Sequence, residues 1–116
     1  MGSKSDEYYM EKALEEIEII FEYNKGLSFE EFISDRKNID ATVFRLQQMV
    51  EQIKSLSSEF KEKHSEIPWG EIIGFRNGIV HEYSKTNYLT VYEIVSHDLF
   101  QLKTLLEDNI KFWLDR

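Results

Sequence analysis

The sequence predicts an all-α protein, an antiparallel four-helix-type bundle with one extra short helix. Two observations support this fold class. Apolar residues recur at three- and four-residue steps along four long segments, which is the period of an amphipathic helix, and no segment shows the alternation of apolar and polar residues that is typical of a strand. Short polar connections favour antiparallel neighbours. With 116 residues the chain can enclose one hydrophobic core, so we expect a single domain over residues 1–116.

The first predicted helix spans residues 6–25, and Gly26 stands where a C-terminal cap belongs. Ser28 and Glu31 have the spacing of a capping box, which predicts a short second helix through Ile33. The apolar face of the first helix carries Tyr9, Ala13, Ile17, Ile20 and Phe21, and its acidic face carries Glu7, Glu11, Glu15, Glu18 and Glu22.

Three further helices follow. One is expected over residues 36–63, with a core stripe at Val43, Leu46, Met49, Val50, Ile53, Leu56 and Phe60. The next begins at Pro68, which suits the first turn of a helix, and runs to about Val80 or His81. Residues 84–87 are expected to form a turn with Asn87 as the N-cap of a last helix over residues 88–113. Its buried face should hold Val91, Ile94, Val95, Leu99, Leu102, Leu105, Leu106, Phe112 and Trp113.

Three glycines, Gly70, Gly74 and Gly78, recur every four residues along one edge of the fourth predicted helix. Each costs about 1 kcal/mol relative to alanine in a helix interior, so something should compensate. We expect this edge to pack closely against another helix, in the same subunit or in a partner. A flexible, weakly helical segment is the alternative.

Composition narrows the class of protein. The residues are 41% hydrophobic and 31% charged, which is typical of a globular protein without membrane spans. Zero cysteines exclude disulfides and thiolate metal sites, and we expect a cytoplasmic location. The formal net charge of -8 is unusual for a nucleic-acid binder, although a cleft lined by arginine can be locally positive.

The segment over residues 76–83 concentrates chemically active side chains. Arg76 keeps its charge at physiological pH and offers a planar set of donors that fits a phosphate. His81 can give or take a proton near neutral pH, and Asn77 lies four residues before it on the same side of a helix. A five-residue step rotates a helix by about 140° beyond whole turns, so Arg76 and His81 would not share a face. A two-fold dimer would bring two such segments to one cleft.

Residues 68–83 resemble the signature block of the HepT-like branch of the HEPN superfamily, whose motif R-x-x-x-x-H-x-Y is matched by Arg76, His81 and Tyr83. Residues 26–32, 35–37 and 40–41 are similar to the N-terminal half of that family, so the resemblance covers nearly the whole chain. The sequence departs from the family at Val50-Glu51-Gln52, where a Gly-Glu-Ala step is common.

The resemblance implies a dimeric, all-helical ribonuclease that acts as the toxin of a bacterial toxin–antitoxin pair. Its RNA-cleaving activity would be restrained by an MntA-type nucleotidyltransferase that attaches AMP to the motif tyrosine, Tyr83. In the expected reaction Arg76 stabilises the charge on the phosphate, and His81 acts as general acid or base. Asn77 would orient His81 or bind the phosphate.

We expect no cofactor and no metal ion at this site, because His64 and His97 are isolated in the sequence and are predicted to lie at the surface. A different reading uses the same residues. The chain would then be a non-catalytic helical partner, or a nucleotide-binding module that regulates a nucleotidyltransferase through Arg76. A purely structural helical dimer is a third possibility, but it leaves the clustering of Arg76, Asn77, His81 and Tyr83 unexplained.

Overall fold

The computed structural model describes residues 5–80 and 85–110, without the side chains of residues 76–80 and 85–87. The described residues form α-helices and one π-helical segment and contain no strand, which confirms the all-α prediction. The helices are α1 (Asp6–Asn24), α2 (Phe29–Ile33), α3 (Arg36–Lys54), α4 (Ser58–Lys63), α5 (Trp69–Val80), α6 (Lys85–Glu93), the π segment η1 (Ile94–Asp98) and α7 (Leu99–Asn109).

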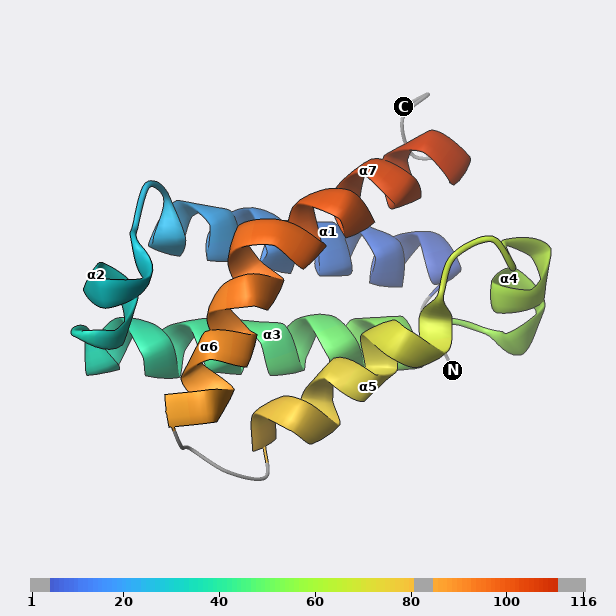
Figure 1. Cartoon of the computed structure of the whole chain (residues 1–116). Helices are drawn as coiled ribbons and strands as arrows, with labels where there is room; N and C mark the ends of the chain where they lie inside the picture. Colours follow the sequence, from blue (N-terminus) through green and yellow to red (C-terminus); the bar gives the residue numbers. More distant parts are fainter. Residues whose placement is uncertain (1–4, 81–84, 111–116) are drawn as a thin grey trace.

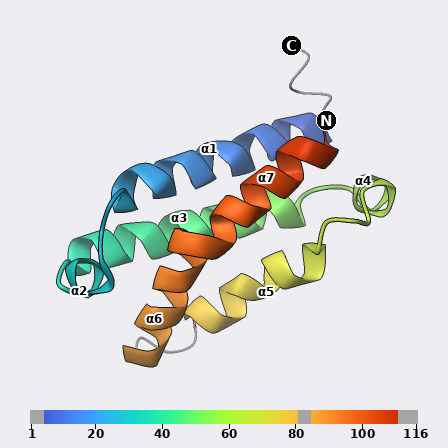
Figure 2. The ribbon, with the colours of Figure 1, turned by 45° about the horizontal axis from the view of Figure 1, so that its top comes forward.

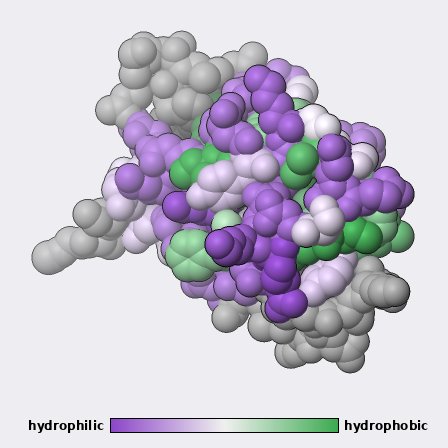
Figure 3. Space-filling view, turned by 90° about the vertical axis from the view of Figure 1, so that its left-hand side faces the viewer, coloured by the Kyte–Doolittle hydropathy of each residue, from purple (hydrophilic) through white to green (hydrophobic). Residues whose placement is uncertain are grey.

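The helices α1 and α3 lie side by side in opposite directions and form one layer (Figures 1 and 2). The second layer contains α5, which runs beside α3, and a long bent helix made of α6, η1 and α7, which crosses the α1–α3 pair. The short helix α2 closes one end of the molecule and α4 the other. At the α2 end the surface is mostly hydrophilic, with separate small hydrophobic patches (Figure 3).

One hydrophobic core joins the two layers. Met10, Ile17 and Ile20 of α1 are fully buried together with Leu46 and Met49 of α3. The other buried apolar residues are Ala13, Phe32, Ile39, Val43, Val50, Ile53, Leu56, Phe60, Ile67, Trp69, Ile72, Val91, Ile94, Val95, Leu99, Leu102, Leu106 and Ile110. The predicted stripe of the third helix is thus confirmed in full, whereas Tyr9, Phe21 and Leu105 are only partly buried.

The predicted boundaries around α2 are confirmed. Gly26 has a φ of 75°, the left-handed conformation that a glycine adopts after a helix C-terminus at little cost. At Ser28 the capping box is complete, since its hydroxyl accepts from the Glu31 backbone N–H at 3.1 Å and its own N–H donates to the Glu31 carboxylate at 2.9 Å.

The prediction of one helix over residues 36–63 was wrong, because the chain breaks between α3 and α4. Asp6, from the first turn of α1, accepts hydrogen bonds from the Ser57 backbone N–H at 2.7 Å and from its hydroxyl at 2.8 Å. The Ser57 hydroxyl in turn accepts from the Phe60 N–H and so caps α4. The chain starts a new helix here and does not continue α3, because Asp6, 51 residues away in the chain, accepts hydrogen bonds from Ser57. The protein therefore has a second short helix.

Polar side chains also join α1 to α3. Thr42 is fully buried, and its hydroxyl accepts a hydrogen bond from the side-chain amide of Asn24 at 3.1 Å. The side-chain oxygen of Asn24 accepts one from the side-chain amide of Asn38 at 2.8 Å. Nearby, Arg45 donates to Glu16 at 3.2 Å. Hydrogen bonds with Tyr23 and Glu16 raise the pKa of Arg45. These contacts favour one register of the two helices, because a shift would leave the buried Thr42 hydroxyl without its partner Asn24.

The last predicted helix differs from expectation in three ways. Asn87 is not an N-cap, because α6 already begins at Lys85 and shortens the connection from α5. The regular helix is interrupted by η1, where the Leu99 N–H donates to the Ile94 carbonyl five residues earlier. Finally, the helix ends at Asn109 and not at Trp113, since Ile110 is extended and buried. Phe112 and Trp113 lie outside the described residues.

None of the helices in the described ranges is long and apolar enough to cross a membrane.

Candidate functional site

The helix that carries the predicted motif, α5, is anchored at its first residue. Trp69 is nearly buried, and its indole N–H donates to the backbone carbonyls of Lys61 and His64, both at 3.1 Å. The Glu71 and Ile72 N–H groups donate to the carbonyl of Pro68, as the predicted start at this proline requires. The turn after α4 is therefore tied to the start of α5. Sequence reasoning missed these bonds, although the indole N–H of a buried tryptophan usually finds a hydrogen-bond acceptor.

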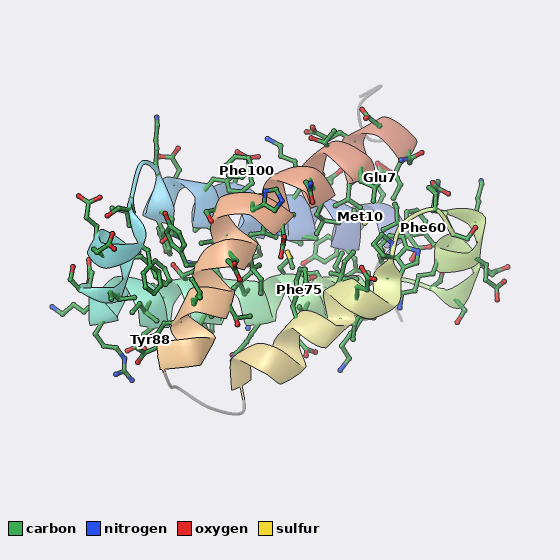
Figure 4. The ribbon with its side chains drawn as sticks, viewed as in Figure 1. Glu7, Met10, Phe60, Phe75, Tyr88 and Phe100 are labelled. Atoms are coloured by element: carbon green, nitrogen blue, oxygen red, sulfur yellow. The ribbon has the colours of Figure 1, made fainter. Side chains whose placement is uncertain are left out.

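Beyond Trp69, one side of α5 faces the core. Ile72 is buried, whereas Ile73 and Phe75 are partly buried against the core. Phe75 lies on the side of α5 that faces the bent helix of the second layer (Figure 4). These contacts hold α5 against α3 and the bent helix up to the turn in which the motif begins.

Two of the predicted catalytic residues, Arg76 and Asn77, belong to the last turns of α5, at backbone positions directly after Phe75. By register, Arg76 follows the buried Ile72 by four residues, about one turn further along the helix. His81 and Tyr83 lie outside the described residues, between the end of α5 at Val80 and the start of α6 at Lys85. The motif therefore begins in the last turns of α5, next to the connection to α6.

At Gly70 and Gly74, the predicted glycine edge of α5 has no close neighbour among the described residues. Gly70 and Gly74 are exposed, and a Cβ atom added to either would meet no described atom within 4 Å. Close packing against the described residues of the same subunit is therefore wrong at these two positions, because Gly70 and Gly74 are exposed while Ile72, on the opposite face of α5, is the buried one. Packing against a partner stays a prediction, and Gly78 lies outside the residues whose side chains are described.

The two other histidines differ in environment. His97 is exposed on η1, as predicted. His64 is not a surface histidine, because only 15% of its side chain is exposed and its ring lies 4.6 Å from that of Phe60. Its Nδ1 atom is 3.6 Å from the Glu66 carboxylate. No group of three or more metal-ligating side chains occurs among the described residues.

Comparison with protein families identifies the chain. The model of the family described as "Ribonuclease HepT-like" matches residues 13–108, which include α5 and the whole predicted motif. The chain belongs to the HepT-like ribonuclease family. The match extends through most of the described fold, so membership does not depend on the short motif alone.

Curated relatives of this HepT-like chain carry ribonuclease names. A protein of Caldanaerobacter subterraneus subsp. tengcongensis, named as a candidate RNase, is 37% identical over 105 residues, which cover 90% of this chain and 94% of the relative. A "Probable ribonuclease HepT" of Thermococcus cleftensis is 32% identical over 104 residues and covers 90% of this chain and 94% of its own length. These relatives and the family model support ribonuclease activity. The comparison with solved structures gave no significant match.

Proposed function

We propose that this HepT-like protein is a metal-independent endoribonuclease and the toxin of a toxin–antitoxin pair. The observation that carries the proposal is the family match over residues 13–108, within which Arg76, His81 and Tyr83 occupy the R-x-x-x-x-H-x-Y pattern. The anchored start of α5 supports it, since a catalytic segment benefits from a rigid element. A cytoplasmic location and a single domain over residues 1–116 complete the proposal.

In the proposed reaction the 2′-hydroxyl of a nucleotide attacks the adjacent phosphorus, and the bond to the leaving 5′-oxygen breaks. Arg76 would stabilise the negative charge that gathers on the non-bridging oxygens, an effect commonly worth about 3–4 kcal/mol for one preorganised donor. His81 would remove the proton from the 2′-hydroxyl or give one to the leaving oxygen, which is typically worth about 10²- to 10⁴-fold. Asn77 would hold His81 or bind the phosphate. The products are a 2′,3′-cyclic phosphate and a 5′-hydroxyl.

We further propose that two copies form one site. On a regular helix continued beyond Val80, Arg76 and His81 would stand about 140° apart, so two copies of the segment would offer more complementary groups to one phosphate than one copy does. The open sides of Gly70 and Gly74 would allow another backbone to approach α5 closely. Gly74→Leu should therefore weaken both self-association and RNA cleavage, and unchanged values of both would count against the paired site.

Tyr83 is the proposed point of control. An AMP group on its hydroxyl would add bulk and negative charge two residues from His81 and would hinder a phosphate from entering. The proposed partner is an MntA-type nucleotidyltransferase encoded beside this chain. Tyr83→Phe should keep nuclease activity and escape inhibition by that enzyme with ATP, whereas a variant that is still silenced would indicate inhibition by binding alone.

The direct test of the reaction uses purified protein, an end-labelled RNA and excess EDTA. We expect cleavage with 2′,3′-cyclic phosphate ends in the parent. A requirement for Mg²⁺, or products with 3′-hydroxyl ends, would contradict the proposed chemistry, because neither follows from attack by the 2′-hydroxyl.

A second candidate function is favoured by the net charge of -8, because this charge is unfavourable for tight RNA binding. In it the chain is a non-catalytic partner that binds a nucleotide through Arg76 and regulates a nucleotidyltransferase. Intact RNA together with retained nucleotidyltransferase binding would favour this function over the nuclease.

A further inference from the structure

A hollow of about 290 Å³ lies between α5 and the bent helix of the second layer. Its lining is mostly apolar, and its two acidic residues are Glu71 of α5 and Asp98 at the end of η1. The remaining lining residues are Pro68, Ile72, Phe75, Gln101, Leu102 and Leu105. Ile72 and Leu102 are buried and belong to the core, so the hollow has a fixed base.

Neither Glu71 nor Asp98 has a hydrogen-bond or ion-pair partner among the described residues. Other acidic side chains of the same fold are paired, such as Glu16 with Arg45 and Glu18 with Lys103. Two acidic residues that pair with no described residue therefore leave, at one mostly apolar hollow, a position that favours a cation.

The π segment contributes to this arrangement. Segments of this kind are rare and occur frequently at functional sites, because they interrupt the regular hydrogen bonds of a helix. Here η1 ends at Asp98, and the next turn supplies Gln101 and Leu102 to the same hollow. The irregular segment thus stands where the bent helix meets α5.

Size and chemistry select the occupant. Pockets for small organic ligands usually measure about 300–1,000 Å³, so this hollow is at the lower limit of that range. An arginine side chain matches it better, because its aliphatic stem packs against apolar groups while its guanidinium bonds to carboxylates. A metal ion matches less well, since the described residues here supply only two carboxylates and the apolar walls offer no further charged ligand.

We infer that the hollow between α5 and α7 is a docking site for an arginine side chain of a partner protein. Charge complementarity commits the site to this occupant: the two carboxylates pair with the guanidinium, and Phe75 and Leu105 flank its stem. Gly70 and Gly74 are absent from the lining, so the site does not depend on the glycine edge that we assign to self-association. The inference also stands independently of the nuclease reaction.

The test titrates ¹⁵N-labelled full-length protein with the blocked pentapeptide acetyl-Ala-Ala-Arg-Ala-Ala-amide and follows backbone amide shifts. We expect saturable shifts confined to residues of α5, η1 and α7 around the hollow. The Glu71→Gln/Asp98→Asn double variant should bind at least about fivefold more weakly, the size expected from two partly exposed ion pairs. The control Glu62→Gln/Asp108→Asn changes the net charge equally at exposed positions outside the hollow and should bind like the parent.

A second peptide with citrulline in place of arginine keeps the shape but lacks the charge, and it should bind at least about fivefold more weakly. Equal binding of the citrulline peptide would overturn the inference, because the hollow would then be only an apolar surface. So would shifts produced by Mg²⁺ but not by the arginine peptide. If the arginine peptide has no effect and the double variant instead alters the oligomeric state, the occupant is a second copy of this chain and the inference is wrong.

Discussion

The α1–α3 pair and the outer side of α5 differ in how completely their groups are used. Between α1 and α3, Thr42 is buried and hydrogen-bonded, and the apolar residues of both helices fill one core. On α5, Gly70 and Gly74 face open space and Glu71 has no partner among the described residues. The groups named in the first region are buried or hydrogen-bonded within one subunit, whereas those named in the second have no partner among the described residues. The molecule therefore separates a stable scaffold from the helix that carries the motif.

The largest expected effect tests that separation. Ile17→Ala opens a cavity at a fully buried position between the two layers and should lower the free energy of unfolding by about 2–5 kcal/mol. The matched change Ile73→Ala on α5 removes a side chain that is only partly buried and should cost about 1 kcal/mol. Urea unfolding followed by circular dichroism measures both. Equal losses would mean that α5 is as integral to the scaffold as α1.

The anchor of α5 should have a smaller effect. Trp69→Phe keeps an aromatic ring but removes the N–H that donates to Lys61 and His64, at a cost of about 1 kcal/mol. Amide hydrogen exchange should become faster in the turn that follows α4. Tyr92→Phe is the control, because it removes a hydrogen bond to the Leu27 carbonyl on the other side of the molecule. Faster exchange after α4 in both variants would show that Trp69 is not a specific anchor.

Alanine substitutions at Gly74 and Gly26 should change the stability of the protein in opposite directions. Gly74→Ala meets no neighbour and should stabilise an isolated subunit by about 1 kcal/mol, because alanine favours a helix more than glycine does. Gly26→Ala should instead destabilise the protein by about 1–2 kcal/mol, since the φ of 75° suits glycine and strains alanine. Thermal unfolding at low protein concentration distinguishes the two. A loss of stability in Gly74→Ala would indicate a close neighbour at α5 that the single subunit lacks.

The smallest effect concerns the ion pair between Lys103 of α7 and Glu18 of α1. The hydrogen bond with Glu18 raises the pKa of Lys103 above its ordinary value of 10.5, so the stabilisation is fully present below pH 10.5 and disappears as the pH rises through the raised pKa. Because both groups are partly exposed, Lys103→Met should cost about 0.5 kcal/mol or less at pH 7. Urea titrations at pH 7 and above pH 11 should show that difference vanish. A larger loss, or one that persists at high pH, would assign Lys103 a different role.

Local signals were readable in the sequence, and long-range ones were not. Gly26 and the Ser28–Glu31 capping box lie within a few residues of the elements they end or begin, so the pattern alone predicted them. The break before α4 depends on Asp6, which lies 51 residues from Ser57 in the chain. Ser57 is a local cap signal, but the apolar period through Ile53, Leu56 and Phe60 outweighed it in the sequence. The π segment was missed for a similar reason, since its apolar residues also suit a regular helix. His64 is mostly buried because it packs against the buried Phe60, and the sequence alone did not show this tertiary contact.

The motif was predicted by type and spacing, and family membership supports that prediction at the level of the whole chain. The meeting of Arg76 with His81, the role of Asn77 and the modification of Tyr83 stay predictions. They depend on side chains beyond those described and on a second copy, and neither a helical period nor one subunit's core determines them.

The most direct test of the account compares cleavage and stability in the same samples. For Arg76→Ala and His81→Ala we expect RNA cleavage in EDTA to fall by at least about 100-fold, while the free energy of unfolding changes by less than about 1 kcal/mol. That result would show that Arg76 and His81 serve the reaction and are not needed for the stability of the fold. Full cleavage by either variant, or a loss of activity matched by a loss of folding, would contradict the account.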